Sequence, residues 1–579
     1  MLLKEGGIKL LQISTGKFFV SDDLHIHDGK GILYTNYSWI NSIDTCIGTI
    51  EPVDYHGNIT SYVFSYKNKL EKDGVLVRTG DHEIIEQFKL IFSYFFQCFS
   101  DSDRNTVELN CRKTKRNMND QFIPYEFAGR IFEPKIYGSE QEVKEFNVFL
   151  KNMIGLERSK YKKLIQCLEA YNNSLLALNH NFELAYSLLI YCLESLSQSF
   201  DNYEPEWEDY NQRIRAKLDT VLNEIGEGKS GKIKNILLED SHLKLQTRLI
   251  NFVSSNIGDD FFIKESVNVH IPLRKSELKQ VLKNAYGIRS KYVHSLQSIM
   301  KQLKMPSIGS GEVFSWEGDP YLTYKGLLRL THHVIKNYFG DQEYYETEEY
   351  HWKDELPGVV YLQLDEKYWI DSTLGFSQEQ AFDKLNGFLS QLAKSYIFEK
   401  PLTNLTELMK IYEKEIPQSK KKYKLAMISN YILYNLSLIE EFRLNNYKKV
   451  IEFNQNFLDE PTIESILTYS ILGQRIPYNA SDTEAIYLKY QKDKFNSSSV
   501  KIPKYFELLL MLNLINKLYE ESELDRYNEW LNKCILDVPG NLALQEYLIA
   551  HKEENSIINI EELRSKRFFL VNEQKNEQT

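Results

Sequence analysis

Short apolar and aromatic stretches, separated by Gly, Asp and Asn, mark the first 135 residues of the chain. Four of them are typical of strands: KFFV at 17–20, GILYTNY at 31–37, SYVFSY at 61–66 and GVLVR at 74–78. Between residues 81 and 100, Ile and Phe instead recur at steps of three and four behind an Asp that could cap a helix. The pattern predicts a β-rich α+β domain over residues 1–135.

A helical period dominates residues 140–340. Apolar residues recur at helical steps in four stretches, at 160–178, 182–200, 210–225 and 320–339. This spacing predicts a helical domain over residues 140–340.

The segment GEGKSGKI, residues 226–233, has the G-x-x-x-x-G-K spacing of a phosphate loop. However, Ile233 stands where a Ser or Thr would hold magnesium, and an amphipathic helix rather than a strand precedes the segment. We therefore expect a flexible connection between helices here, and no nucleotide site.

An acidic stretch, DQEYYETEEYHWKDEL at 341–356, contains seven acids and one lysine, which predicts an exposed connection. Together with the extended segment expected after it, it forms a linker over residues 341–374. The period is helical again over 375–579, where 447–461 and 527–541 faintly resemble tetratricopeptide-type hairpins. The predicted fold class is therefore mainly α and multidomain.

Composition narrows the function classes. The 579 residues carry a net charge of −11, so a site for a polyanion requires a local excess of Lys and Arg. The six Cys form no C-x-x-C pair, which favours reduced thiols in the cytosol over a zinc site or a disulfide framework. No signal-peptide core is visible at the start, and no apolar run reaches the roughly 18 residues of a membrane span. We expect a cytoplasmic protein that contacts no membrane and uses no metal or cofactor.

The local excess of positive charge lies at residues 273–304, with eight Lys or Arg and one acid. Apolar positions at helical spacing run through the same residues and predict one helix. AYGIRSKYVHSLQ, at 285–297, places Arg289 and His294 beside this stripe, close to Gly287. A glycine costs a helix about 1 kcal/mol relative to Ala, which is more tolerable where a partner helix must approach the backbone closely.

The spacing of Arg289 and His294 is weak evidence by itself, because about one match to R-x(4–6)-H is expected by chance in such a chain. Five helical steps rotate by about 500°, so the two side chains diverge by about 140°. A site that uses both is better formed by two such helices meeting across the two-fold axis of a homodimer.

YGIRSKYVHS resembles the signature helix of HEPN domains, in particular the Apea-like branch of bacterial antiphage ribonucleases. The helices that contain LLALNHNFELAYSLLIYCLESLSQSF, the acidic loop with Trp207 and the closing helix GLLRLTHHVIKNYF are similar to that branch as well. The resemblance covers about residues 160–340 and implies that the helical domain is a HEPN-like bundle.

The resemblance implies a metal-independent endoribonuclease of antiphage, abortive-infection defence, with tRNA as a candidate substrate. His294 would act as general acid or base at the RNA 2′-hydroxyl and the leaving 5′-oxygen, and Arg289 would stabilise the phosphate. Ser290, where the family often has Asn, Asp or His, and Glu194 would be auxiliary residues. The expected RNA contacts are Lys283 and Lys291. The implied partners are a second copy of the chain, RNA, and a phage or host protein that triggers activity through the N-terminal domain.

Structural interpretations compete with this one. Arg289 would form a structural ion pair with Glu194 or with an acid of the 201–209 loop, and the helical domain would then serve only for dimerisation in a scaffold. Glu194 also belongs to a polar stripe that suits a solvated helix face. The other members of the stripe are Glu183, Ser187, Tyr191 and Gln198.

Two further patterns are weighed in the same way. His25 with His27, and His332 with His333, are interpreted as structural rather than as metal ligands, because the first pair lacks a third ligand and the second pair points apart on a helix. The acidic residues 341–356 would alternatively cover the basic helix and mimic RNA until a signal displaces them.

Overall fold

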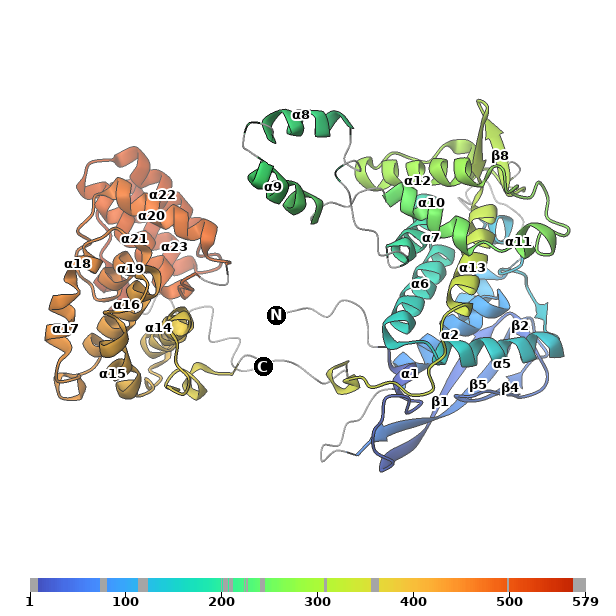
Figure 1. Ribbon diagram of the computed structural model, residues 1–579, viewed down its shortest axis with the longest axis horizontal. Coiled ribbons are helices and arrows are strands. Elements are labelled where there is room, and N and C mark those ends of the chain that lie inside the picture. The colour runs from blue at the N-terminus through green and yellow to red at the C-terminus, as the bar shows by residue number, and fades with distance from the viewer. Residues whose placement is uncertain are drawn as a thin grey trace. The chain divides into compact units, whose positions relative to one another are not determined.

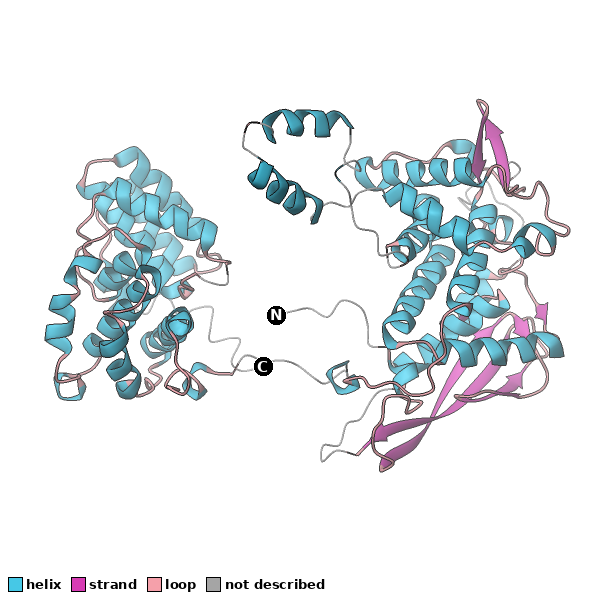
Figure 2. Ribbon diagram, viewed as in Figure 1, coloured by secondary structure: helices cyan, strands magenta, loops and turns pink. Residues whose placement is uncertain are grey.

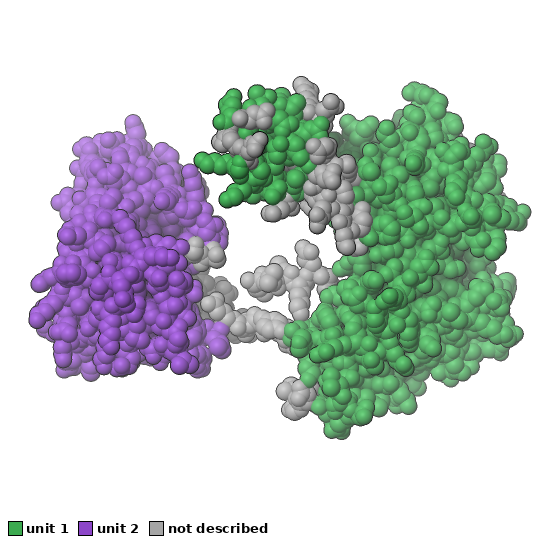
Figure 3. All heavy atoms as spheres, viewed as in Figure 1, with its two compact units in different colours: residues 1–360 green, residues 361–579 purple. Residues whose placement is uncertain are grey.

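The computed structural model describes residues 9–72, 81–112, 123–198, 200, 207, 212–222, 224, 227–239, 245–306, 310–355, 364–496 and 499–565. The chain divides into two compact units, residues 1–360 and 361–579, which are described separately (Figure 3). It is mainly helical, with a small α+β region at the N-terminus, which confirms the predicted fold class at this coarse level (Figure 2). No helix of the described ranges is both long and apolar enough to cross a bilayer.

The N-terminal sheet is built on two long strands. β1 (Leu24–Thr35) pairs antiparallel with β5 (Thr60–Glu71) over its whole length. The short strands β3 (Ile43–Asp44), β4 (Gly48–Asp54) and β6 (Ser100–Asp101) complete the order β3-β4-β5-β1-β6. A separate parallel pair joins β2 (Tyr37–Ser38) to β7 (Ile136–Tyr137).

The strand predictions were partly wrong in extent. The stretches 31–37 and 61–66 lie mostly in longer strands. The remaining residues of these strands mix charged residues, polar residues and glycine with single apolar residues, so no apolar run marks them. Residues 17–20 form turns and bends instead of a strand. The stretch 74–78 lies outside the described residues.

One face of the sheet is covered by α2 (His82–Phe96), the helix predicted at 81–100. The Phe64 ring of β5 stacks on Phe88 of α2 with the ring centroids 4.0 Å apart. A Cβ on Gly31 would come within 2.2 Å of Ile85, so the glycine lets helix and strand approach closely. Asp81 accepts a hydrogen bond from the Tyr66 hydroxyl at 2.6 Å and does not cap the helix backbone.

Most other helices of the first unit pack onto this region, whereas α8 and α9 stand apart from it (Figure 1). The long helices are α5 (Glu140–Ile154), α6 (Arg158–Ala177), α7 (Phe182–Ser197), α10 (Leu245–Asn256), α12 (Leu278–Ser295) and α13 (Tyr324–Gly340). The shorter helices are α1 (Leu10–Ile13), α3 (Arg104–Asn110), α4 (Pro124–Phe127), α8 (Gln212–Leu222), α9 (Glu227–Glu239) and α11 (Asp259–Ile263). Sheet and helices share one continuous apolar core.

The segment 226–233 is not the flexible connection that we expected. α9 begins at Glu227, so Gly228 and Gly231 lie inside a helix. Nothing lies within 4 Å of a Cβ built on either glycine, so each costs only helix propensity, about 1 kcal/mol. A regular helix turns its backbone N–H groups inward and cannot form the loop that cradles a phosphate.

α12 ends earlier than its apolar stripe predicts. Ser295 is its last residue, and Leu296 adopts a left-handed conformation with φ of 52°. Ile299 and Leu303 are buried beyond the helix, and Leu303 lies in the 3₁₀ turn Lys301–Lys304.

A hairpin that the sequence analysis missed follows this turn. β8 (Val313–Trp316) and β9 (Asp319–Leu322) pair through a tight turn in which both Glu317 and Gly318 have positive φ. Strands of four residues leave too short an alternation to stand out in sequence.

Residues 341–355, here called the acidic strap, pack against the first unit and are not a free linker. The backbone N–H of Arg158, at the start of α6, donates to both carboxylate oxygens of Glu348 at 2.9 and 3.1 Å. Glu355 accepts from Arg158 and from Lys162, and Trp352 is buried. These contacts hold the strap on α6 rather than on α12, which argues against the hypothesis that it covers the basic helix.

The second unit consists of helices and turns in its described residues. The first helices are α14 (Ala381–Phe398), α15 (Thr406–Glu415), α16 (Lys421–Ser437), α17 (Tyr447–Phe453), α18 (Gln455–Leu458) and α19 (Ile463–Ile471). They are followed by α20 (Ala480–Asp493), α21 (Lys504–Glu520), α22 (Leu524–Leu536), α23 (Leu542–Glu554) and α24 (Ile560–Ser565). The two stretches that look alike in sequence differ in structure. The helical part of 447–461 is broken into α17 and α18, whereas residues 527–536 continue one helix, α22, and 537–541 lie beyond its end. In the predicted extended segment, Glu366–Tyr368 forms a 3₁₀ turn, and 356–363 lies outside the described residues.

Candidate functional site

α12 packs against α7 and α10 near one end of the first unit (Figure 1). Its N-terminal half is anchored by the buried side chains of Leu278, Val281, Leu282 and Ala285. Its C-terminal half contributes no fully buried side chain. Arg289 and His294 therefore sit on the part of the helix that leaves the core.

Arg289 is directed toward α7. Its Nη2 lies 3.0 Å from Oε2 of Glu194, whose side chain is only 5% exposed. The distance is that of an ion pair, but Nε of Arg289 and Oε2 of Glu194 have no aligned hydrogen-bond partner. Burial raises the pKa of the Glu194 carboxyl, and the charges of Arg289 and His294 offset only part of this rise. The site thus contains a guanidinium N–H without a hydrogen-bond partner, and beside it a carboxyl group whose charged form is disfavoured by burial.

His294 is exposed in the last turn of α12. It leaves the helix about 140° around the axis from Arg289. It is nevertheless close enough to Glu194 for its charge to lower the pKa of that carboxyl. Within one chain, the two predicted catalytic side chains therefore share an end of the helix but point in different directions.

The basic character of α12 lies in lysines without counter-charges. Lys279, Lys283 and Lys291 are exposed and pair with no carboxylate of the described ranges. By contrast, Lys275 contacts Asp259 just before the helix begins. Ser290 is half-buried between these lysines. A helix with unpaired lysines suits an anionic partner.

The polar stripe on α7 is only partly solvated, with Tyr191 and Gln198 exposed. Ser187 and Glu194 are buried, and Glu183 is paired with Lys304, whereas Tyr191 is exposed. The Ser187 hydroxyl has no hydrogen-bond partner. Buried polar atoms without an aligned hydrogen-bond partner therefore occur on both helices, on Ser187 and Glu194 of α7 and on Arg289 of α12.

His332 and His333 make contacts within the fold, and Nε2 of His27 lies 3.3 Å from the side-chain amide nitrogen of Asn68. Burial lowers the pKa of His332 to about 4, and its Nε2 lies 3.2 Å from the Tyr94 carbonyl oxygen. Nε2 of His333 accepts from the backbone N–H of Gly258 at 3.0 Å, so Nδ1 carries the proton toward Glu265. The described residues contain no group of three His, Cys, Asp or Glu side chains that could hold a metal ion.

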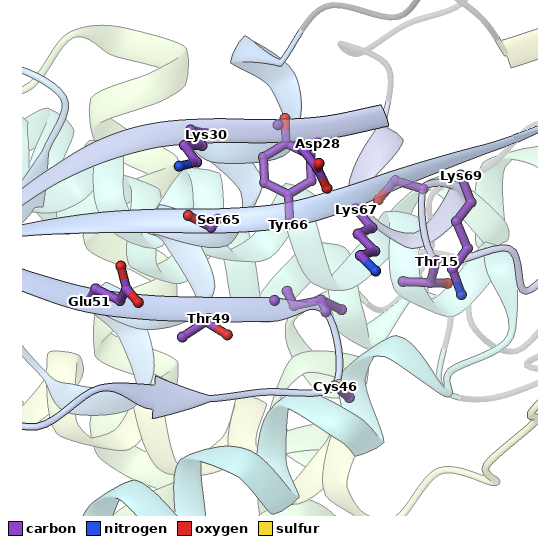
Figure 4. A pocket seen from close by; sticks show the side chains of 14 residues that line it. Thr15, Asp28, Lys30, Cys46, Thr49, Glu51, Ser65, Tyr66, Lys67 and Lys69 are labelled. Atoms are coloured by element: carbon purple, nitrogen blue, oxygen red, sulfur yellow. The ribbon is translucent and has the colours of Figure 1, made fainter. Parts of the chain in front are cut away.

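A cavity of about 560 Å³ on the open face of the N-terminal sheet escaped the sequence analysis. Figure 4 shows Lys30, Lys67 and Lys69 around it, together with Asp28 and Glu51. Alternate residues of a strand point to one face, so the alternating charges of β1 and β5 could have indicated it. Both signs of charge are mixed across this cavity, which gives it no definite ligand class.

No protein-family model, curated protein or solved structure matches this chain. The function of the site is therefore argued from its residues and their geometry.

Proposed function

We propose that the chain is a metal-independent endoribonuclease of the HEPN type that acts as a homodimer in antiphage defence. The observation that supports the proposal most is that the C-terminal half of α12 carries both Arg289, which lies beside Glu194, and the exposed His294. Lys283 and Lys291 on the same helix pair with no carboxylate of the described residues and would supply the positive charge that RNA requires. The N-terminal α+β region would sense the phage or host trigger, and the second unit would bind a regulatory partner.

The proposed reaction is transesterification within the RNA strand. A His294 imidazole accepts the proton of the 2′-hydroxyl, the 2′-oxygen attacks the neighbouring phosphorus, and the bond from phosphorus to the 5′-oxygen breaks. The resulting imidazolium gives its proton to the leaving 5′-oxygen, and Arg289 stabilises the charge that develops on the phosphate, with Ser290 and Glu194 as auxiliary groups. The products are a 2′,3′-cyclic phosphate end and a 5′-hydroxyl end.

A second copy of the chain would complete the site. The two helices that carry Glu194 and Arg289 also expose large apolar side chains, Leu184 and Tyr191 on α7 and Val293 and Leu296 on α12. A two-fold axis through this surface would cover them and would place each Arg289 near the partner's His294. In this arrangement the Arg and the His of one site come from different copies, so the divergence of about 140° between them on one helix no longer separates them.

The function is tested by incubating the purified full-length protein with total tRNA in the presence of EDTA. Cleavage that leaves cyclic phosphate ends is the expected result. Intact tRNA at all protein concentrations, with toxicity also absent in cells, would argue for the second candidate below.

We expect Leu296→Asn to convert the dimer to a monomer without weakening α12. Leu296 is 81% exposed, so its side chain contributes little to the stability of the folded monomer. Its φ is positive, and asparagine tolerates this left-handed backbone better than leucine does. Losing one buried leucine from each copy would raise the dissociation constant by about 100-fold or more. Sedimentation velocity measures the change. Leu374→Asn, at an exposed leucine of the second unit, is the control, and an unchanged dimer in Leu296→Asn would place the interface elsewhere.

The second candidate is a catalytically inactive dimerisation and scaffold protein. The contact between Arg289 and Glu194 favours it, because an arginine that bridges two helices is not free to hold a phosphate. Such a protein would still dimerise, and its helical second unit would assemble partners. RNA would then remain intact while Leu296→Asn still dissociates the dimer.

A further inference from the structure

The β8–β9 hairpin carries aromatic side chains on one of its faces. Phe314 lies opposite Tyr321, and their rings stack with centroids 5.6 Å apart and an angle of 30° between the planes. Trp316 lies two positions after Phe314, which puts it on the same face of the ribbon, and it is 43% exposed. The opposite face carries Val313 and Leu322, which are buried. The aromatic face is thus the one that the chain leaves partly open.

The hairpin is fixed beside α12. The side-chain amide of Asn284 donates to the Pro320 carbonyl oxygen at 2.8 Å, and that of Gln280 donates to Asp319 at 3.4 Å. The tight turn at 317–318 restricts the tip further. Trp316 is therefore held in a defined place relative to the helix.

The open side of α12 next to these contacts is a basic track. Lys279, Lys283, Gly287 and His294 follow one another at steps of four, four and seven, which places them on one face of the helix. No atom lies within 4 Å of a Cβ built on Gly287, so the backbone is accessible there. This face can accept a phosphate chain that runs between the hairpin and His294.

We propose that this track and the hairpin bind the single-stranded segment of the RNA substrate, with one base stacked on Trp316 and the phosphates along Lys279 and Lys283. The inference rests on the proposed nuclease function. Exposed aromatic rings beside unpaired lysines are the usual means of holding single strands, and the unpaired charge favours RNA over a protein partner. Asn284 lies about 15 Å along the helix from His294, so the stacked base is not the one at the scissile bond.

The test measures the binding of a fluorescent single-stranded oligonucleotide to full-length protein with His294→Ala, in which the RNA stays intact. Adding Trp316→Ala is expected to weaken binding by about 5- to 150-fold, whereas Trp316→Phe retains most of the affinity. Trp316→Ala leaves the salt dependence unchanged, while Lys283→Ala lowers the slope of log affinity against log salt by about 0.7. Phe453→Ala, at an exposed ring of the second unit, is the matched control.

Three outcomes would overturn the proposal in distinguishable ways. If Trp316→Ala leaves the affinity for the oligonucleotide unchanged while the wild type cleaves RNA, the stacking site is wrong and the nuclease function stands. If the His294→Ala protein does not bind the oligonucleotide and the wild type does not cleave RNA, neither the RNA-binding site nor the nuclease function stands. A change in sedimentation without a change in RNA affinity on Trp316→Ala assigns the hairpin to protein docking instead.

Discussion

His294→Ala is expected to lower the rate of tRNA cleavage by about 10²- to 10⁴-fold, because it removes the group that transfers protons to and from the reacting oxygens. The His294 side chain is exposed at the end of α12, so its removal leaves no cavity in the core. Initial rates in EDTA, with the product ends identified by mass spectrometry, measure the effect. The circular dichroism spectrum and the dimer are expected to stay unchanged.

The matched control for this prediction is His25→Ala, which removes an equally exposed histidine from β1. It should cleave at the wild-type rate. If His294→Ala also kept the wild-type rate and the same product ends, the activity would come from another site or another protein, and His294 would have no role in it.

The sequence predicted the helix at this site but not how its two key residues are presented. Three- and four-residue spacing identified α12, and the local charge identified it as a basic helix, because both properties are local. The early end of α12 is not local. The apolar stripe continues to Leu303, but Leu296 turns the chain in a left-handed conformation, and Ile299 and Leu303 are buried after the helix has ended. The helix end is set by packing elsewhere in the bundle.

The environment of Arg289 depends on a residue 95 positions away. Glu194 stood in a stripe that looked suitable for solvent, and only the crossing of α7 and α12 buries it beside the guanidinium. Burial of a polar stripe by another helix leaves no trace in the local periodicity. The resemblance to a family singled out Glu194, whereas the pattern on α7 did not.

The acidic strap shows the same limit for the fold. Seven acids in sixteen residues predict solvent exposure, and five of them are exposed, namely Asp341, Glu343, Glu346, Glu349 and Asp354. Here Lys17, Arg158 and Lys162 approach Glu348 and Glu355 from distant parts of the chain. Ion pairing of this kind depends on the tertiary fold, so an acidic run that is packed cannot be distinguished from one that is free by composition.

Glu355→Gln is expected to lower the free energy that holds the strap on α6 by about 3 kcal/mol at neutral pH. Arg158 is 1% exposed and directs Nε and Nη2 at Glu355, so the substitution leaves a buried guanidinium without its counter-charge. Hydrogen exchange of full-length protein, followed in peptides from α6 and from the strap, measures the free energy of local opening. Glu349→Gln, at an exposed acid of the same strap, should leave the exchange unchanged.

The pH dependence separates the charge of Glu355 from its hydrogen bonds. Burial raises the pKa of this carboxyl, but Arg158, Lys162 and Tyr350 lower it further, to about 2 from an ordinary value of 4.5. Because the pKa is depressed in the folded state, its contribution to stability is complete above about pH 4.5 and is lost as the pH falls toward 2. The difference between the wild type and Glu355→Gln should therefore be largest at neutral pH and shrink below about pH 4.5. If the difference in opening free energy between the two proteins stayed constant down to pH 2, the geometry of the hydrogen bonds, and not the carboxylate charge, would hold the strap in place.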